Sequence, residues 1–154
     1  MRTVIAIDPG KTTGLAVFYY DGTASPVLHS AGEYDVWKFV EELHAAIVFA
    51  RQQHGTTDIV CERFIINAQT VRNSQAPYSI EQIGILKYVM YTLGIDPESI
   101  IFQSPADAKK MFPNSALKTL KYWTVGSDGH DKDAIRHALI RLVKTGWVPK
   151  ALLQ

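Results

Sequence analysis

The chain has 154 residues, of which 47% are hydrophobic and 20% are charged, and its formal net charge is +1. This balance is typical of one globular domain with a sizeable core, and it excludes a disordered protein, a collagen and a coiled coil. Apolar runs stay well short of the roughly 20 residues of a membrane-spanning helix, and Asp8 comes before a signal-peptide core could form, so we expect a soluble protein of the cytoplasm.

The N-terminal part is predicted to form three antiparallel strands. Residues 4–7 are apolar without alternation, which indicates a short central strand that is buried on both faces and ends at Asp8. Residues 15–20 and 27–31 follow as two more strands with a turn signal between them, and together they predict a hairpin.

A helix and a fourth strand come next. Apolar residues recur at intervals of three and four between Asp35, a suitable N-cap, and Gly55, a suitable C-cap. This spacing predicts an amphipathic helix. Residues 59–61 then form another short apolar strand, which ends at Glu62.

The remaining chain alternates helices with one more strand. Ser79 and Gln82 form a capping box for a helix that runs to Gly94, and residues 100–102 predict the fifth strand. Three further helices are expected: one that opens at Ser104, one over 116–123, and a last one that closes near Gly146. This order predicts a single α/β domain over 1–154, with a five-stranded mixed sheet (three antiparallel strands, then two parallel) and helices on both faces.

Two carboxylates stand at the ends of predicted strands. Asp8 and Glu62 each follow a short apolar strand, where a structural role for an acid is hard to find. Ligands of open α/β sheets bind beyond the carboxyl ends of the strands, so neighbouring strands would bring these two acids together.

The last helix offers a third acid. His130 and Asp133 are three residues apart and share one face of that helix, whereas Asp131 points away from Asp133 by about 160°. Asp133 also lies on the polar side of the helix, so periodicity alone does not distinguish it from an ordinary surface acid. The other members of that side are His137, Arg141 and Lys144.

A cluster of these acids would need a cation. Two carboxylates about 4 Å apart repel by roughly 4 kcal/mol at an effective dielectric constant near 20, so the cluster must take up protons or bind cations. Oxygen-rich sites without cysteine favour Mg²⁺ or Mn²⁺. Two such ions can activate water and stabilise the leaving oxygen of a phosphodiester, which predicts a nuclease active site.

Three segments, in this order and spacing, match a known family. They are Ile5-Ala6-Ile7-Asp8-Pro9-Gly10 with Gly14, Val60-Cys61-Glu62-Arg63-Phe64, and His130-Asp131-Lys132-Asp133-Ala134. On these residues the chain resembles the RuvC-like Holliday junction resolvases of the ribonuclease H-like superfamily, over nearly its whole length. Its compact size and simple loops look like those of a phage-encoded member, which would act in the host cytoplasm.

The resemblance implies a mechanism and a partner. Asp8, Glu62 and Asp133 would bind two catalytic divalent ions, Mg²⁺ or Mn²⁺, and His130 would join them as a ligand or a proton-transfer group. Members of this family act as homodimers that nick a four-way junction symmetrically, and a two-fold partner suits a two-fold substrate.

Charge is distributed unevenly along the chain. Residues 104–154 carry 9 Lys and Arg against 4 Asp and Glu, whereas residues 1–103 carry 7 against 11. This asymmetry fits either a surface for an anionic partner, nucleic acid above all, in the C-terminal third or a solvated helix face. The candidate DNA-binding residues are Lys109, Lys110, Lys118, Lys121, Arg72 and Phe64. Phe64 is open to two interpretations, a wedge inserted into DNA or a packed aromatic residue at a strand end.

Two other functions remain open. One keeps the nuclease and changes its substrate to replication forks, flaps or RNA–DNA hybrids. The other is a non-catalytic junction-binding module, which would bind mainly through phosphate contacts. The intact Asp8, Glu62 and Asp133 argue against the second, since a protein without a metal has no use for a costly acid cluster.

Overall fold

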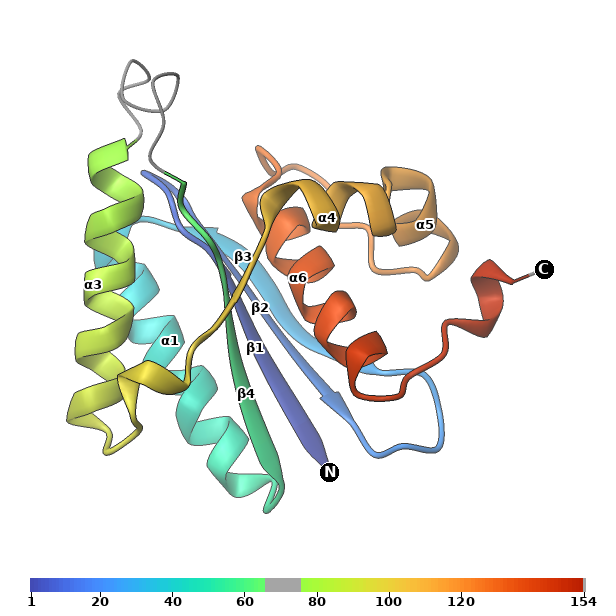
Figure 1. Ribbon diagram of the computed structural model, residues 1–154, viewed down its shortest axis with the longest axis horizontal. Helices are drawn as coiled ribbons and strands as arrows, with labels where there is room; N and C mark the ends of the chain where they lie inside the picture. The colour runs from blue at the N-terminus through green and yellow to red at the C-terminus, as the bar shows by residue number, and fades with distance from the viewer. Residues whose placement is uncertain (66–75, 154) are drawn as a thin grey trace.

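The computed structural model describes residues 1–65 and 76–153, and it contains the predicted mixed sheet (Figure 1). The strand order is β3-β2-β1-β4-β5. Neighbours β3, β2 and β1 are antiparallel, whereas β1, β4 and β5 are parallel, as the sequence predicted. The strands are β1 (Arg2–Asp8), β2 (Thr13–Tyr20), β3 (Val27–Tyr34), β4 (Thr56–Glu62) and β5 (Ile101–Gln103).

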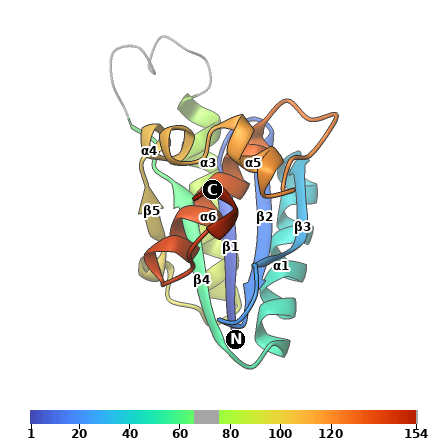
Figure 2. The same ribbon diagram turned by 90° about the vertical axis from the view of Figure 1, so that its right-hand side faces the viewer.

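Helices cover both faces of the sheet (Figures 1 and 2). One face carries α1 (Val36–Gln52) and α3 (Ala76–Thr92), and the other carries α4 (Pro105–Met111), α5 (Asn114–Thr119) and α6 (His130–Lys144). Helix α5 ends four residues before the predicted boundary at residue 123, and Lys121 beyond it has a left-handed φ of 62°. Within 1–65 and 76–153, no helix is both long and apolar enough to cross a membrane.

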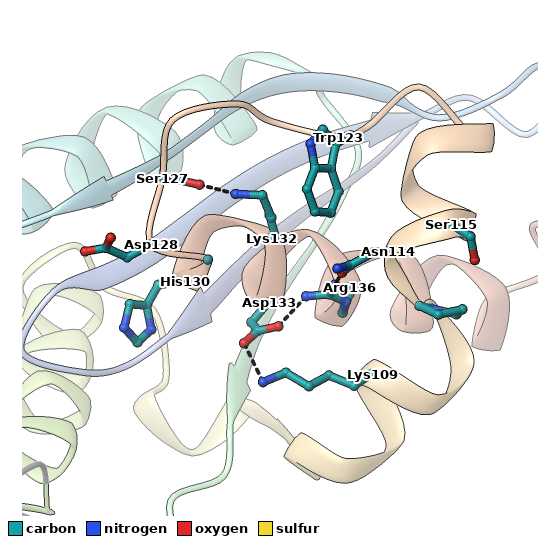
Figure 3. A pocket seen from close by; sticks show the side chains of 12 residues that line it. Lys109, Asn114, Ser115, Trp123, Ser127, Asp128, His130, Lys132, Asp133 and Arg136 are labelled. Atoms are coloured by element: carbon teal, nitrogen blue, oxygen red, sulfur yellow. Dashed lines mark hydrogen bonds and ion pairs between the residues drawn. The ribbon is translucent and has the colours of Figure 1, made fainter.

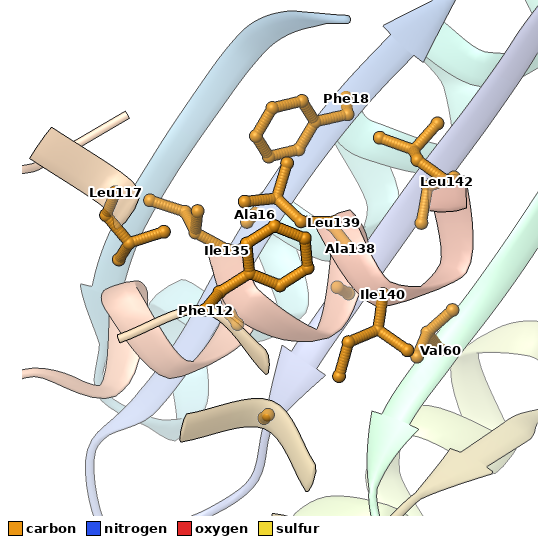
Figure 4. Close-up of a cluster of buried hydrophobic side chains, with 14 of the residues drawn as sticks. Ala16, Phe18, Val60, Phe112, Leu117, Ile135, Ala138, Leu139, Ile140 and Leu142 are labelled. Atoms are coloured by element: carbon orange, nitrogen blue, oxygen red, sulfur yellow. The ribbon is translucent and has the colours of Figure 1, made fainter. Parts of the chain in front are cut away.

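The two-residue repeat of the strands sorts the side chains into two cores. In β1, Val4 and Ala6 pack against the α6 side, whereas Ile5 and Ile7 pack against α1 and α3. Asp8 continues the first series, so its side chain belongs to the α6 face. Figure 4 shows the core on that face, which includes Ala16, Phe18, Val60, Phe112, Leu117, Ile135, Ala138, Leu139, Ile140 and Leu142.

Two predicted helix caps are wrong. Helix α3 begins at Ala76, so Ser79 lies inside the helix, where its buried hydroxyl donates a hydrogen bond of 2.9 Å to the Pro9 carbonyl. Helix α1 ends at Gln52 with Gln53 as its cap, so Gly55 is not the C-cap. A Cβ on Gly55 would lie 2.0 Å from the Met1 carbonyl oxygen, and this close approach explains the glycine.

Candidate active site

Asp8 and Glu62 lie side by side at one edge of the sheet. Strands β1 and β4 are parallel, and their register pairs Ile7 with Cys61, so the next residue on each strand is an acid. Glu62 follows Val60 by two residues, as Asp8 follows Ala6, so both carboxylates are on the α6 face. Asp8 is 5% exposed.

Helix α6 brings the two other predicted residues to this edge. His130 Nδ1 lies 2.8 Å from Asp8 Oδ2, and Asp133 comes one turn later on the same helix. Burial raises the pKa of Asp8, the hydrogen bond with His130 opposes that effect, and the negative charges of Glu62 and Asp133 raise the pKa further. The same hydrogen bond raises the pKa of His130. Asp8 therefore lies close enough to Glu62 and Asp133 for their charges to act on its carboxylate, as expected for a cluster of acids.

Asp133 is held between two cations at the edge of a groove (Figure 3). One of its oxygens accepts a hydrogen bond from the Arg136 guanidinium, and Lys109 Nζ lies 3.1 Å from the other. The groove has a volume of about 950 Å³ and runs from His130 and Asp133 to Trp123. Lys132 also lines it, with its Nζ 5.0 Å from the centroid of the Trp123 ring. The groove is therefore lined by basic side chains and borders His130 and Asp133 at one end.

Two residues on the polar side of α6, His137 and Arg141, face the sheet rather than solvent. His137 is fully buried, and its Nε2 lies 2.9 Å from Glu62 Oε2. One turn later Arg141 binds Asp58 on β4, with an Nε to Oδ2 distance of 3.0 Å. Periodicity alone did not distinguish this side of the helix from a solvated face; in the structure His137 and Arg141 find partners on β4, whereas Lys144 is exposed.

The N-terminus of α6 is fixed by a residue that sequence reasoning missed. Strand β3 extends to Tyr34, three residues beyond its predicted end, and this extension contains Glu33. The Glu33 carboxylate accepts backbone N–H hydrogen bonds from residues 128, 129, 130 and 131, at 2.9, 2.7, 2.6 and 3.4 Å. A carboxylate at this position accepts the hydrogen bonds of the otherwise unpaired N–H groups of the first turn, and its negative charge interacts favourably with the helix dipole.

Gly14 lets α6 approach the sheet. A Cβ at this position of β2 would lie 2.0 Å from the carbonyl oxygen of His130 and 2.3 Å from its carbonyl carbon. Gly14 also pairs with Glu33 across β2 and β3. Gly14 and the neighbouring Glu33 therefore place the start of α6, with His130, beside the strand-end acid Asp8.

The stabilisation by Glu33 should depend on pH. Burial would raise the pKa of Glu33, but the backbone hydrogen bonds outweigh it and lower this pKa below its ordinary value of 4.5. We expect Glu33→Ala to destabilise the fold by about 1–3 kcal/mol near neutral pH. The folded state favours the ionised carboxylate of Glu33, so this stabilisation exists only while Glu33 is ionised. The difference in free energy of unfolding between the wild-type protein and Glu33→Ala should therefore vanish as the pH falls through the lowered pKa. Urea unfolding of both proteins near neutral pH and near pH 3 measures this; an unchanged difference would contradict it.

The predicted DNA-binding residues are dispersed. Lys109 contacts Asp133, and Lys118 Nζ lies 5.0 Å from the centroid of the Trp123 ring. Lys110 and Lys121 are exposed, and Phe64 is half-buried after the end of β4. Arg72 lies outside the described residues.

The donor set fits a hard divalent cation. Asp8, Glu62 and Asp133 supply carboxylate oxygens, which are the ligands that suit Mg²⁺ and Mn²⁺, and His130 adds one imidazole nitrogen beside them. Burial and, after it, the negative charges of Glu62 and Asp133 raise the pKa of Asp8, and a bound cation would oppose both effects by stabilising the carboxylate. Each carboxylate now has a nitrogen partner, and in the described part of the chain no three His, Cys, Asp or Glu side chains converge as a ready-made metal site. Binding would therefore require these side chains to exchange a nitrogen partner for the ion.

Solved structures share this architecture, although no protein-family model and no curated protein sequence matches the chain. RuvC from T. thermophilus in complex with a Holliday junction substrate aligns with a TM-score of 0.64 and 17% identity, over 94% of this chain and 96% of that one. A second structure of Thermus thermophilus RuvC gives 0.64 and 16% over the same shares. A Fowlpox virus resolvase with substrate Holliday junction DNA aligns at 0.47 and 12%, over 92% and 99%. The chain has the ribonuclease H-like fold of RuvC, as its sequence motifs predicted.

Proposed function

We propose that this protein is a divalent-metal-dependent endonuclease that cuts branched DNA, four-way junctions above all. The observation that carries the proposal is the placement of Asp8 and Glu62 at neighbouring strand ends, with His130 in contact with Asp8 and Asp133 one turn further along α6, in a RuvC-like fold. RuvC was solved with a Holliday junction substrate, which supports the choice of substrate for this chain.

Asp8, Glu62, Asp133 and His130 are the residues that would hold two Mg²⁺ or Mn²⁺ ions. When bound, such ions lower the pKa of water and stabilise the departing oxygen of a phosphodiester. His130 is a ligand only as the neutral imidazole; in its protonated form, which the hydrogen bond with Asp8 favours by raising its pKa, it would instead carry a proton beside Asp8. Arg136, itself buried, holds one oxygen of Asp133 in place.

The groove beside these residues would take the DNA backbone. Lys109, Lys132 and Arg136 line it, and an anionic strand is the natural partner of such a surface. Lys110, Lys118, Lys121 and Arg72 are further candidates for phosphate contacts. Phe64, which follows the strand of Glu62, is the candidate wedge at the branch point.

A cleavage panel tests the function. The substrates are a four-way junction, a fork, a flap, a plain duplex and an RNA–DNA hybrid, each with Mg²⁺, with Mn²⁺ and with EDTA. We expect paired nicks in the junction, products with 5′ phosphates, and no cutting in EDTA. Faster cutting of forks, flaps or hybrids would favour the alternative nuclease, and tight junction binding without cutting would favour the non-catalytic module. Equal cutting of duplex would refute structure selectivity.

A homodimer would match the two-fold symmetry of the junction. Helix α3 presents two large exposed side chains suitable for an interface, Tyr88 at 68% and Tyr91 at 72% exposure. We expect light scattering at micromolar concentration to show a dimer, and the double variant Tyr88→Arg, Tyr91→Arg to show a monomer because it places charge in that interface.

The control for the dimer is Trp37→Arg. Trp37 is 79% exposed on α1, so its replacement places the same charge on a large exposed aromatic residue of a different helix. This variant should remain a dimer. A monomeric wild-type protein, or dissociation by Trp37→Arg alone, would contradict the proposed interface.

A further inference from the structure

A fully buried histidine connects Glu62 to a third strand. His137 Nε2 lies 2.9 Å from Glu62 Oε2, and His137 Nδ1 lies 2.9 Å from Gln103 Oε1. The register of β4 and β5 pairs Glu62 with Gln103, so both side chains reach the same turn of α6. None of the sequence motifs above includes Gln103 or His137.

For a neutral His137, the hydrogen-bonding capacity of these groups favours one arrangement. A neutral imidazole carries a single N–H, yet both ring nitrogens of His137 face oxygens. Gln103 Nε2 is buried and, within the described residues, has no hydrogen-bond partner. A half-turn of the Gln103 amide brings this nitrogen against His137 Nδ1 and satisfies the orphaned donor. The proton of His137 then sits on Nε2 and is donated to Glu62. The cost is one unpaired amide oxygen, which is better tolerated in protein interiors than an unpaired N–H.

We propose that Gln103 and His137 are positioning residues that hold the Glu62 carboxylate in the orientation needed to bind a divalent cation. The proposal rests on the metal-dependent function above. Gln103 fixes the tautomer of His137, and His137 fixes Glu62 through Oε2. Partners behind metal ligands restrict the orientation of the ligand, and their removal costs about 10- to 100-fold in metal affinity or activity.

The position of His137 argues for this role rather than for packing alone. Burial of a polar ring is unfavourable unless its nitrogens are paired, and an apolar side chain would fill the same space without that requirement. The attachment of α6 to β4 has a separate polar contact one turn away, between Arg141 and Asp58. That contact provides a control with a similar structural role and no contact with an acid of the site.

The test compares Gln103→Met, His137→Leu, His137→Gln and the control Arg141→Leu. Mn²⁺ binding is measured by calorimetry on the full chain without DNA, the tautomer of His137 by ¹H–¹⁵N NMR, and kcat and KM on the junction. We expect the proton on Nε2 of His137 in the wild-type protein. Gln103→Met and His137→Leu should weaken Mn²⁺ binding by about 10- to 100-fold and lower kcat, with little change in KM. His137→Gln keeps a donor for Glu62 and should recover most of the affinity, whereas Arg141→Leu should lower only the melting temperature.

Three results would overturn the proposal. They are a wild-type protein that binds no Mn²⁺, wild-type Mn²⁺ affinity in Gln103→Met and His137→Leu, and an His137 proton on Nδ1. If His137→Leu does not fold, Gln103→Met and the NMR measurement decide. A wild-type protein that binds Mn²⁺ with this pattern of affinities but cuts no branched DNA would support the positioning pair while refuting the proposed nuclease.

Discussion

Asp8→Asn is expected to abolish DNA cleavage without weakening the fold. The loss should exceed about 100-fold, because even removal of partners behind metal ligands costs 10- to 100-fold. Burial and the charges of Glu62 and Asp133 raise the pKa of Asp8, so the ionised carboxylate is unfavourable in the folded protein without a cation. The amide of asparagine has the same shape but no charge, so it avoids both the cost of burying a carboxylate and the repulsion from Glu62 and Asp133. The melting temperature without metal should therefore stay the same or rise, and junction binding in EDTA should persist.

Glu62→Gln and Asp133→Asn should also abolish cleavage. The melting temperature of Asp133→Asn need not stay the same or rise as that of Asp8→Asn should. Asp133 binds Arg136 and Lys109, and its replacement would weaken both contacts. Glu41→Gln is the matched control: Glu41 is an exposed acid of α1, on the opposite face of the sheet. Full cleavage by Asp8→Asn, or a comparable loss in Glu41→Gln, would contradict the assignment of the acids.

Gly14→Ala is expected to impair both stability and cleavage. The added Cβ would overlap the backbone of His130 at 2.0 Å, and backbone cannot rotate away as a flexible side chain can. Overpacking of this kind costs about 1–3 kcal/mol. If α6 moves to relieve it, His130 and Asp133 move away from Asp8 and Glu62, and a displacement on the order of 1 Å can reduce the rate about 100-fold. Urea unfolding and the junction-cleavage rate measure the two effects.

Gly22→Ala separates displacement of the site from general loss of stability. Gly22 has a φ of 94° and open space around it, so alanine there introduces backbone strain without a clash. It should destabilise the fold by about 1 kcal/mol and leave cleavage unchanged. Equal cleavage by Gly14→Ala and the wild-type protein would show that the close packing of α6 on β2 does not position the site.

Asp8 and Glu62 could be singled out from the sequence because the features that mark each of them, a short apolar strand and an acid at its end, lie within a few residues of each other. A strand has a repeat of two residues, so an acid two positions after a core residue stays on the core face until the strand ends. Asp8 and Glu62 satisfy this condition, and the sequence predicted that they would meet if their strands were neighbours, which the parallel pairing of β1 and β4 provides. The structure confirms both the sheet and their place on it.

The surroundings of α6 could not be predicted, because they depend on contacts distant in the sequence. Polar residues on one side of a helix usually indicate solvent, but His137 and Arg141 are matched by Glu62 and Asp58 on β4. Glu33 caps α6 across 95 to 98 residues of chain. One local clue was present: His130, Asp133 and His137 share one helix face, which is unusual for a simple solvated surface beside an acid site.

Ser79 shows why a local pattern can fail. Its spacing to Gln82 is that of a capping box, yet the helix starts three residues earlier at Ala76. The hydroxyl instead binds the carbonyl of Pro9, next to the strand-end acid Asp8. A tertiary partner has therefore replaced the local one, and no sequence window of ordinary length contains both residues.

A crystal of the protein soaked in Mn²⁺ and measured at a wavelength where manganese scatters anomalously tests the proposed metal site most directly. We expect anomalous peaks within about 2.0–2.5 Å of carboxylate oxygens of Asp8, Glu62 and Asp133, and their disappearance in Asp8→Asn. The proposed metal site would be contradicted if manganese bound elsewhere while the three acids kept their present partners. Those partners are His130 for Asp8, His137 for Glu62 and Arg136 for Asp133.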